Sequence, residues 1–120
     1  MPHRIEVGMK PGHPDAAGMG VRRRLEDDLG IQAADVRVIQ VYTINAELSS
    51  DELDRIRIEL FTDPIIQDST VDASLAIGEA YHGFAYAIEV GFRPGVTDNV
   101  GKSSVEGISD TLGRSLKAGE

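Results

Sequence analysis

The sequence predicts an α+β fold in two layers, with helices packed on a small sheet. Three observations carry this prediction. Short alternating apolar segments predict strands, apolar stripes of helical period predict amphipathic helices, and one strand–turn–helix pattern occurs twice within the 120 residues. A chain of this length normally forms one domain, or a small domain and part of another.

The repeat relates residues 5–30 to residues 88–113 at a constant offset and without a gap. So many identities over so short a span exceed what two unrelated segments would share by chance. The identical pairs are Ile5/Ile88, Glu6/Glu89, Val7/Val90, Gly8/Gly91, Pro11/Pro94, Gly12/Gly95, Asp15/Asp98, Gly18/Gly101, Asp27/Asp110, Leu29/Leu112 and Gly30/Gly113.

Each copy opens with a strand that faces a core on one side. Residues 5–7 and 88–90 both read Ile-Glu-Val, which is an apolar–polar alternation. A Pro-Gly pair then ends each strand with turn-forming residues. A helix follows in each copy, with Asp15 or Asp98 at its N-cap position and Gly30 or Gly113 just past its end. The apolar stripes of these helices are Val21, Leu25 and Leu29, and Val105, Ile108 and Leu112.

The first copy continues beyond its helix. Residues 36–48 are rich in β-branched side chains and predict a bent strand or a two-strand hairpin. Ser49, with Glu52 three positions later, forms a capping-box pattern that begins a second helix. That helix has Leu53, Ile56 and Leu60 on its apolar face. Residues 62–64 end it, and Ile65 and Ile66 begin another strand.

These elements predict a two-layer ferredoxin-like sandwich, βαβ(β)αβ, followed by a partial second copy. We expect one unit at residues 1–72, a connector at 73–83 and the partial second unit at 84–120. A half-complete unit leaves sheet edges open, which favours self-association or docking onto a larger protein. The chain is therefore expected to be a fragment of a longer polypeptide or to be completed by another chain.

Composition narrows the functional class. The core must be aliphatic, because aromatic residues are only 5% of the chain and Trp is absent. A net charge of −8 disfavours nucleic acid as a partner. The absence of Cys excludes disulfides, a thiol nucleophile and Cys-ligated zinc. No apolar run approaches the roughly 20 residues of a membrane span, and no signal-peptide pattern is present, so a cytoplasmic protein without a membrane partner is expected.

Two Gly-rich segments invite an interpretation as phosphate or anion sites. Residues 95–103 end in Gly-Lys-Ser before a helix, but the spacing between the glycines is one residue longer than a phosphate-binding loop requires. Residues 18–20 precede three arginines, Arg22, Arg23 and Arg24. A helix N-terminus with nearby Arg can hold an anion, but a solvated face, with the arginines near Glu26, Asp27 and Asp28, is the favoured interpretation.

No catalytic, cofactor-binding or metal-binding residues emerge from the sequence. His3, His13 and His82 lie far apart and at no metal-ligand spacing. No Ser sits in a nucleophile elbow, and no carboxylate pair stands out in apolar surroundings. Residues 62–68 (TDPIIQD) allow two interpretations. They end the helix and form an ordinary edge strand, or they form an edge that pairs with a strand of a partner protein.

The order of these segments resembles the PurS family, the small subunit of phosphoribosylformylglycinamidine synthase of the purine pathway. The likeness covers residues 3–72, and residues 84–116 as the start of a second copy. The segments LFTDPIIQD and IEVGFRPGVTDNVG are also similar to the N-terminal region of PurL-type synthase subunits, where a doubled PurS-like module precedes the catalytic part. The residues that carry the likeness are Ile5-Glu6-Val7, Lys10, Asp15, Gly18, Val21, Leu25, Val36-Arg37 and Pro64-Ile65-Ile66-Gln67-Asp68.

The resemblance implies an accessory role in an enzyme that uses ATP, glutamine and formylglycinamide ribonucleotide. PurS-like modules are not catalytic; they link the glutaminase to the synthetase and support ammonia transfer. The implied partners are PurL-type synthetase and PurQ-type glutaminase subunits, together with further copies of the chain as a homo-oligomer. Because this chain lacks the ATP- and magnesium-binding parts and the glutaminase Cys, no active site and no cofactor are expected within it. Two alternatives stay open: a ferredoxin-like regulatory domain that binds a small ligand at the turn formed by Gly8, Pro11 and Gly12, and a phosphotransferase that uses Gly101-Lys102-Ser103.

Overall fold

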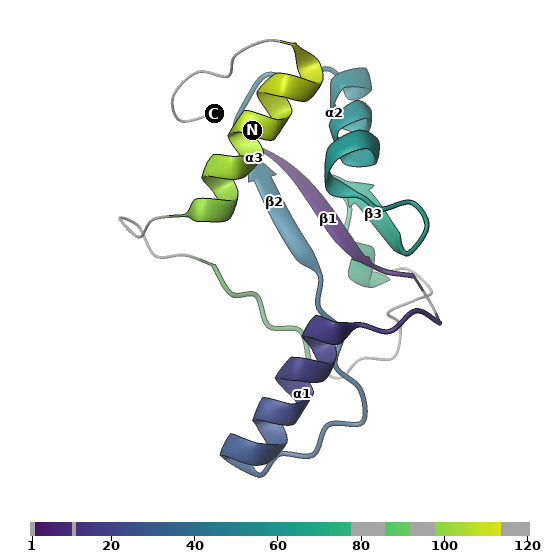
Figure 1. Cartoon of the computed structure of the whole chain (residues 1–120), viewed down its shortest axis with the longest axis vertical. Coiled ribbons are helices and arrows are strands. Elements are labelled where there is room, and N and C mark those ends of the chain that lie inside the picture. The colour runs from purple at the N-terminus through teal and green to yellow at the C-terminus, as the bar shows by residue number, and fades with distance from the viewer. Residues whose placement is uncertain (1, 11, 78–85, 92–97, 114–120) are drawn as a thin grey trace.

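The computed structural model describes residues 2–10, 12–77, 86–91 and 98–113. Two helices, α2 and α3, lie beside a small sheet, while a third, α1, projects from its lower end (Figure 1). The elements are β1 (His3–Met9), α1 (Ala16–Leu29), β2 (Gln40–Ile44), α2 (Ser50–Ile56), a π-helical turn η1 (Arg57–Phe61), β3 (Gln67–Val71), a 3₁₀ turn η2 (Leu75–Ile77) and α3 (Asn99–Leu112).

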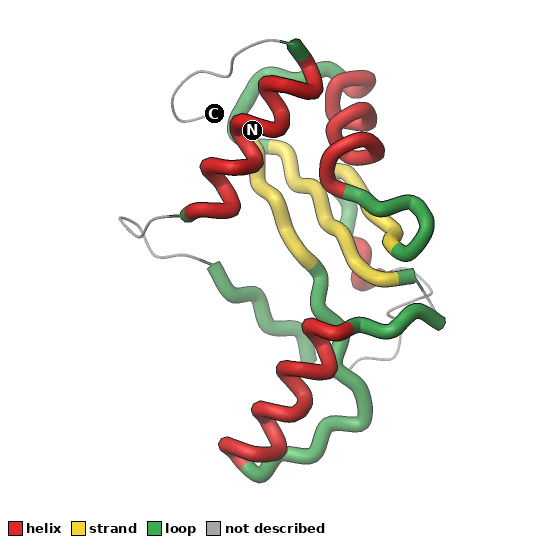
Figure 2. Tube along the Cα trace, viewed as in Figure 1, coloured by secondary structure: helices red, strands yellow, loops and turns green. Residues whose placement is uncertain are grey.

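The sheet has three antiparallel strands in the order β2-β1-β3 (Figure 2). Ile5 of β1 lies opposite Tyr42 of β2 on one side and Val71 of β3 on the other. The predicted two-layer α+β class is confirmed. Residues 36–48 contribute the single strand β2 rather than a hairpin, and Leu48 already packs on the helical core.

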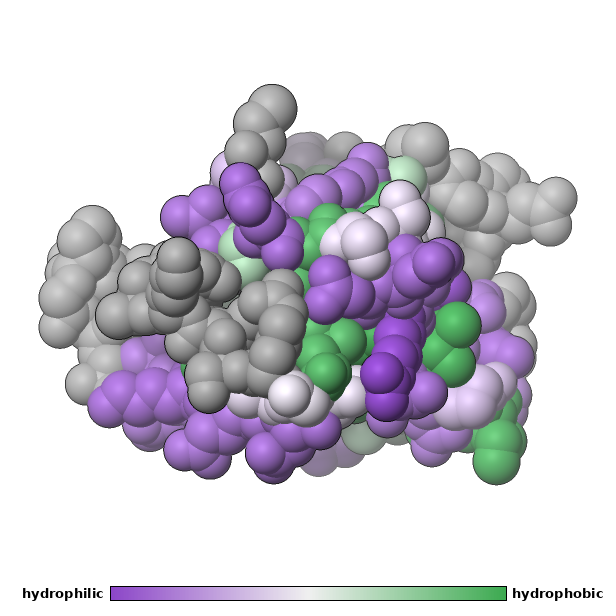
Figure 3. All heavy atoms as spheres, turned by 90° about the horizontal axis from the view of Figure 1, so that it is seen from above, coloured by the Kyte–Doolittle hydropathy of each residue, from purple (hydrophilic) through white to green (hydrophobic). Residues whose placement is uncertain are grey.

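The core is aliphatic and lies between the sheet and the two covering helices. Ile5 and Val7 point to the same face of β1 because strand side chains alternate. They are fully buried with residues of β2, α2 and α3, namely Ile44, Leu53, Ile56 and Ile108. At the end of the molecule nearest these helices the surface is mainly hydrophilic, with hydrophobic side chains showing between polar ones (Figure 3).

Helix α2 begins with the predicted capping box. The Ser49 hydroxyl accepts a hydrogen bond from the Glu52 N–H at 3.1 Å, and the Ser49 N–H donates to the Glu52 carboxylate at 3.0 Å. The helix then widens into η1, which shifts the phase of the following side chains. Leu60 remains 37% exposed, although its side chain lies against α3 at Gly107, whereas Phe61 stacks on Tyr42 with ring centroids 4.2 Å apart.

The two helices of the repeat have matching ends. Asp15 and Asp98 have nearly the same backbone angles (φ −106°, ψ 92° and φ −102°, ψ 92°), and each side chain accepts from the N–H of a Gly three positions on. Gly30 and Gly113 both adopt the left-handed conformation, with φ of 65° and 70°. The predicted caps are thus confirmed at both ends of both helices.

The strand predicted at residues 88–90 is wrong for this structure. Residues 86–91 are extended but pair with no strand of the described chain, and Ile88 and Val90 are 87% and 88% exposed. A strand without a neighbour leaves its backbone groups unpaired, so it gains no ladder stability. The turn of this copy, at residues 92–97, lies outside the described residues.

The core-facing position expected for α1 is also wrong. Its predicted apolar stripe is largely in water, with Val21 and Leu29 exposed and Leu25 half-buried. The face of the sheet where α1 was expected is covered instead by α3, the helix of the second copy, through Ile108 and Leu112.

Candidate functional site

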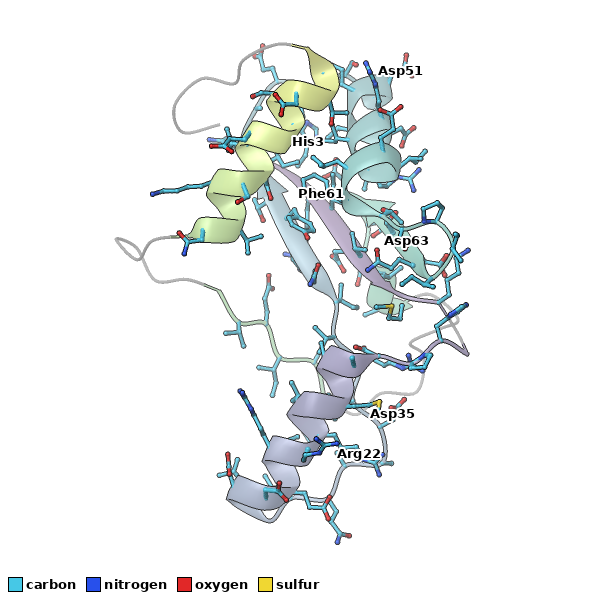
Figure 4. All side chains as sticks on the ribbon, in the orientation of Figure 1. His3, Arg22, Asp35, Asp51, Phe61 and Asp63 are labelled. Atoms are coloured by element: carbon cyan, nitrogen blue, oxygen red, sulfur yellow. The ribbon has the colours of Figure 1, made fainter. Side chains whose placement is uncertain are left out.

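An open hollow lies between the first turns of α3 and the aromatic pair Tyr42 and Phe61. Its volume is about 410 Å³, and its lining comprises Tyr42, Leu60, Phe61, Asn99, Val100, Ser103 and Ser104. Figure 4 shows Phe61 over β2, on the helix-covered side of the sheet. The Tyr42 hydroxyl donates to Gln40 at 3.0 Å, and burial raises the pKa of Tyr42. The lining carries the hydroxyls of Tyr42, Ser103 and Ser104 and the amide of Asn99 among apolar side chains.

The Gly-Lys-Ser segment does not form a phosphate-binding loop in the described part of the chain. Gly101, Lys102 and Ser103 all lie within α3. The Asp98 carboxylate accepts from the Gly101 N–H at 2.8 Å, so it occupies the helix N-terminus where an anion would bind. A carboxylate there disfavours a phosphate at this helix N-terminus. Residues 95–97 of the segment lie outside the described residues.

The proposed anion site at the start of α1 fails for the same reason. One Asp15 oxygen accepts from the Gly18 N–H at 2.9 Å, and the other accepts from the Val38 N–H at 2.8 Å. Both oxygens of this buried carboxylate therefore tie α1 to the segment before β2. The arginines at 22–24 are exposed, and no hydrogen bond or ion pair within the described chain joins them to the acidic residues at 26–28.

One histidine is engaged in a contact that sequence reasoning did not foresee. The His3 Nδ1 donates to an Asp72 carboxylate oxygen at 2.9 Å, and the other oxygen accepts from the Arg4 N–H at 2.8 Å. Asp72 has a φ of 54°, so it turns the chain sharply just after β3. His13 lies in the turn before α1, and His82 lies outside the described residues. Within the described ranges no group of His, Cys, Asp and Glu could hold a metal ion.

We expect Asp72→Asn to reduce stability at neutral pH and to flatten its acid dependence. The hydrogen bond from His3, followed by that from the Arg4 N–H, lowers the pKa of Asp72. A carboxyl whose folded pKa is lowered stabilises the protein above its unfolded pKa of about 3.9, and this contribution is lost as the pH falls through the folded pKa. Since the Asp72 side chain is 47% exposed, the loss at pH 7 should be no more than about 1 kcal/mol.

The measurement is urea unfolding between pH 7 and pH 2.5 for the wild type, Asp72→Asn and the control Asp110→Asn. Asn tolerates the left-handed conformation of position 72, so the comparison isolates the charge. Asp110 is exposed on α3, and its variant should follow the wild type. If the free energies of unfolding of the wild type and Asp72→Asn fell in parallel with pH, the stabilising role given to the Asp72 carboxylate would be wrong.

A buried carboxylate on β1 was also missed by sequence reasoning. Glu6 accepts from the Arg4 Nε at 2.8 Å and from the Leu75 N–H at 3.2 Å. Arg4 also donates to Glu89 at 3.0 Å, and these two carboxylates raise the pKa of the guanidinium, Glu6 more than Glu89. The available signal was the spacing of Arg4 and Glu6, which places both on one face of the strand, opposite the core. Glu6 and Glu89 are repeat counterparts, so a single Arg holds the equivalent acid of both copies.

The segment at 62–68 is a turn followed by an edge strand. The Asp63 carboxylate accepts from the Ile65 N–H at 3.0 Å, and β3 begins only at Gln67, two residues later than predicted. In the described chain β3 pairs with β1 alone and β2 pairs with β1 alone, so both outer strands have an unpaired edge. Ile65 is exposed at the turn. The structure thus provides the open edges that partner pairing needs.

The turn that was predicted to bind a small ligand is separate from the residues that line the hollow. Gly8 is buried within β1, where it pairs with Asp68 of β3. Gly12 is exposed with a φ of 82°, and Pro11 lies outside the described residues. Neither Gly8 nor Gly12 lines the hollow.

Comparison with known proteins gives matches only at the level of structure. No protein-family model and no curated protein matches the sequence. A solved PurS subunit of FGAM synthetase matches with a TM-score of 0.52 and 21% identity, over 58% of this chain and 88% of that one. This chain has a PurS-like fold. PurS of B. subtilis matches at 0.52 and 19% identity (59% and 94% covered), and PurS of Methanocaldococcus jannaschii at 0.50 and 20% identity (58% and 90% covered).

The PurS-like region is therefore close to a whole PurS subunit in extent. The M. jannaschii protein is described as one of the subunits of formylglycinamide ribonucleotide amidotransferase in the purine biosynthetic pathway. At these identities the likeness establishes the fold. No helix among the described residues is long and apolar enough to cross a membrane.

Proposed function

We propose that the chain is a non-catalytic bridging module of phosphoribosylformylglycinamidine synthase, in de novo purine biosynthesis. It links a PurQ-type glutaminase to a PurL-type synthetase in the cytoplasm and supports ammonia transfer between them. The observation that carries the proposal is the PurS-like fold, matched over nearly the whole of three PurS subunits. The open edges of β2 and β3 and the hollow beside Phe61 supply docking surface.

The chemistry of the described residues agrees with an accessory role. Ammonia is a nucleophile only while unprotonated, so its path must be shielded from water and from acids. A module for this purpose contributes walls and contact area rather than acid–base groups. The aliphatic core, and a hollow lined by hydroxyls, an amide and apolar groups, fit that requirement. We propose that the chain binds no cofactor of its own.

The test is reconstitution with the glutaminase and synthetase subunits of the same organism, in the presence of glutamine and Mg-ADP. Co-elution of all three proteins is expected in size-exclusion chromatography. Synthase activity with glutamine should require the chain, whereas activity with added ammonium salt should not, since free ammonia bypasses the bridge. Failure to associate, or equal dependence of both activities on the chain, would overturn the proposal.

A small-ligand regulatory domain is the second candidate, and the hollow is the observation that favours it. Thermal-shift screening against amino acids and nucleotides separates the two functions. Saturable stabilisation by one metabolite, lost when Ser104 is replaced by Leu, would favour a regulatory site.

A further inference from the structure

A π-helical turn coincides with the hollow beside Phe61. Such turns are rare, and they occur frequently at functional sites. Here the turn is η1, which ends with Leu60 and Phe61, and both of these neighbouring side chains line the hollow. The irregular end of the second helix therefore shapes one wall of the hollow, which makes this hollow the strongest candidate for a ligand site in the described chain.

The same wall is aromatic. The rings of Tyr42 and Phe61 stack with an angle of 29° between their planes, and both side chains are only partly buried. They leave ring surface in the hollow on which a planar ligand can stack. Because aromatic pairs contribute more than the area that they bury, an aromatic ligand gains more here than an aliphatic one of equal size. Burial raises the pKa of the Tyr42 phenol, so this group stays neutral at neutral pH.

The α3 side of the hollow carries neutral hydrogen-bonding groups, namely the Asn99 carboxamide and the hydroxyls of Ser103 and Ser104. Within the described part of the chain, none of these three side chains makes a hydrogen bond. A carboxamide presents a donor beside an acceptor, and this pair matches the edge of adenine, where an amino group lies beside a ring nitrogen. The Ser hydroxyls both donate and accept, as the hydroxyls of a sugar do. The polar groups therefore match a nucleoside.

The charge at this end of α3 favours a neutral ligand over an anion. The Asp98 carboxylate accepts from the Gly101 N–H and so occupies the helix N-terminus beside Asn99, where a phosphate would otherwise be attracted. Lys102 is exposed and is not among the lining residues. The net charge of −8 disfavours a nucleic-acid strand as the source of the base. A free nucleoside therefore fits the hollow better than a nucleotide or an RNA.

We propose that the hollow binds a neutral purine nucleoside with an adenine-type base. The base lies against the ring pair of Tyr42 and Phe61, its amino edge faces Asn99, and the sugar hydroxyls meet Ser103 and Ser104. The volume of about 410 Å³ lies within the range of about 300–1,000 Å³ that is typical of small-molecule sites.

This proposal rests on the second candidate function, the small-ligand regulatory domain, and it names the class of ligand. It is independent of the bridging role, because the reconstitution experiment alone tests that role. A module that links two enzymes can also bind a nucleoside, so success of one proposal does not exclude the other.

Isothermal titration calorimetry of the full chain with adenosine tests the proposal, and saturable one-to-one binding is expected. Asn99→Ala should weaken the affinity about fivefold, since the paired donor and acceptor are lost. Asn99 is exposed, so the variant should remain folded. The matched control is Asn45→Ala, an exposed Asn after β2 outside the lining, which should bind as the wild type does. Phe61→Leu keeps an apolar side chain against the core but removes the ring, and should weaken the affinity about tenfold.

Related ligands give a second and more specific readout. Inosine has a carbonyl where adenosine has the amino group, so its edge presents two acceptors and it should bind about fivefold more weakly. AMP should bind no more tightly than adenosine, and indole, which has a ring but no matching edge, should bind more weakly.

No binding of adenosine, tighter binding of AMP, or unchanged affinity in Asn99→Ala would each overturn the proposal. If adenosine failed but another metabolite stabilised the chain and lost its effect in Ser104→Leu, the nucleoside would be wrong and the regulatory function would stand. If no metabolite bound, both would be wrong.

Discussion

A Gly18→Ala variant is expected to lose about 2–3 kcal/mol of its free energy of unfolding. Gly18 is buried in the first turn of α1, and a Cβ there would overlap the carbonyl oxygen of Val36 and press on the Asp15 carboxylate. The oxygen belongs to the backbone, so it cannot rotate away as a side chain can. The same Asp15 also binds the Val38 N–H, which couples the helix start to the segment entering β2.

The matched control is Gly20→Ala, on the same helix, where a Cβ would meet nothing within 4 Å. That variant should gain about 0.5–1 kcal/mol, since Ala is the better helix former. Urea unfolding of both variants measures the difference, with the slope of each transition checking that the unfolded states remain alike. If Gly18→Ala were as stable as the wild type, the close approach of the Val36 carbonyl oxygen to Gly18 would be wrong.

Gly18 and Gly101 are identical in the repeat, and each lies beside the carboxylate that caps its helix. A Cβ at Gly101 would lie 2.6 Å from an Asp98 carboxylate oxygen. At Gly101 the capping carboxylate is the nearest obstacle to a Cβ, whereas at Gly18 the Val36 carbonyl oxygen lies closer than the Asp15 carboxylate. The helix caps and the capping box were predicted well from the sequence, because each depends on residues only a few positions apart.

What the sequence did not predict was which helix covers which strand. Leu25 and Ile108 are similar in character and occupy equivalent positions, yet only Ile108 is in the core. At Gly107, α3 packs closely against the Leu60 side chain, and the counterpart on α1 is Arg24, which is too large for that contact. The difference between Gly107 and Arg24 is visible in the sequence. Its effect on packing depends on Leu60, which is distant along the chain.

The polar contacts of the candidate sites also divide into local contacts, which the sequence predicts, and contacts between distant segments, which it does not predict. The hydrogen bond of Asp15 to Gly18 is local and was expected. The contacts of Arg4 with Glu89 and of His3 with Asp72 join segments far apart in sequence, and no periodicity specifies them. That no acid–base constellation exists stays a prediction from composition and spacing, whereas the hollow beside Phe61 required the helix packing to be known.

An Ile108→Ala variant is expected to lose about 2–4 kcal/mol, because it leaves a cavity where α3 meets the sheet. Ile108 is 2% exposed and packs in one cluster with Ile5, Val7 and Ile56. The control is Val100→Ala on the same helix, where the side chain is 59% exposed and the change should stay within about 0.5 kcal/mol. Denaturant unfolding of the full chain measures both.

The comparison decides whether the second copy is part of the folding unit of the first. If α3 only rested on the surface, Ile108→Ala would behave like Val100→Ala, and the PurS-like sheet would have to be stable with that face uncovered. A large and selective loss at Ile108 shows instead that the core is shared between the two copies. One copy then supplies the sheet and α2, and the other supplies α3, the second covering helix, so an added or lost repeat would alter the stability of both.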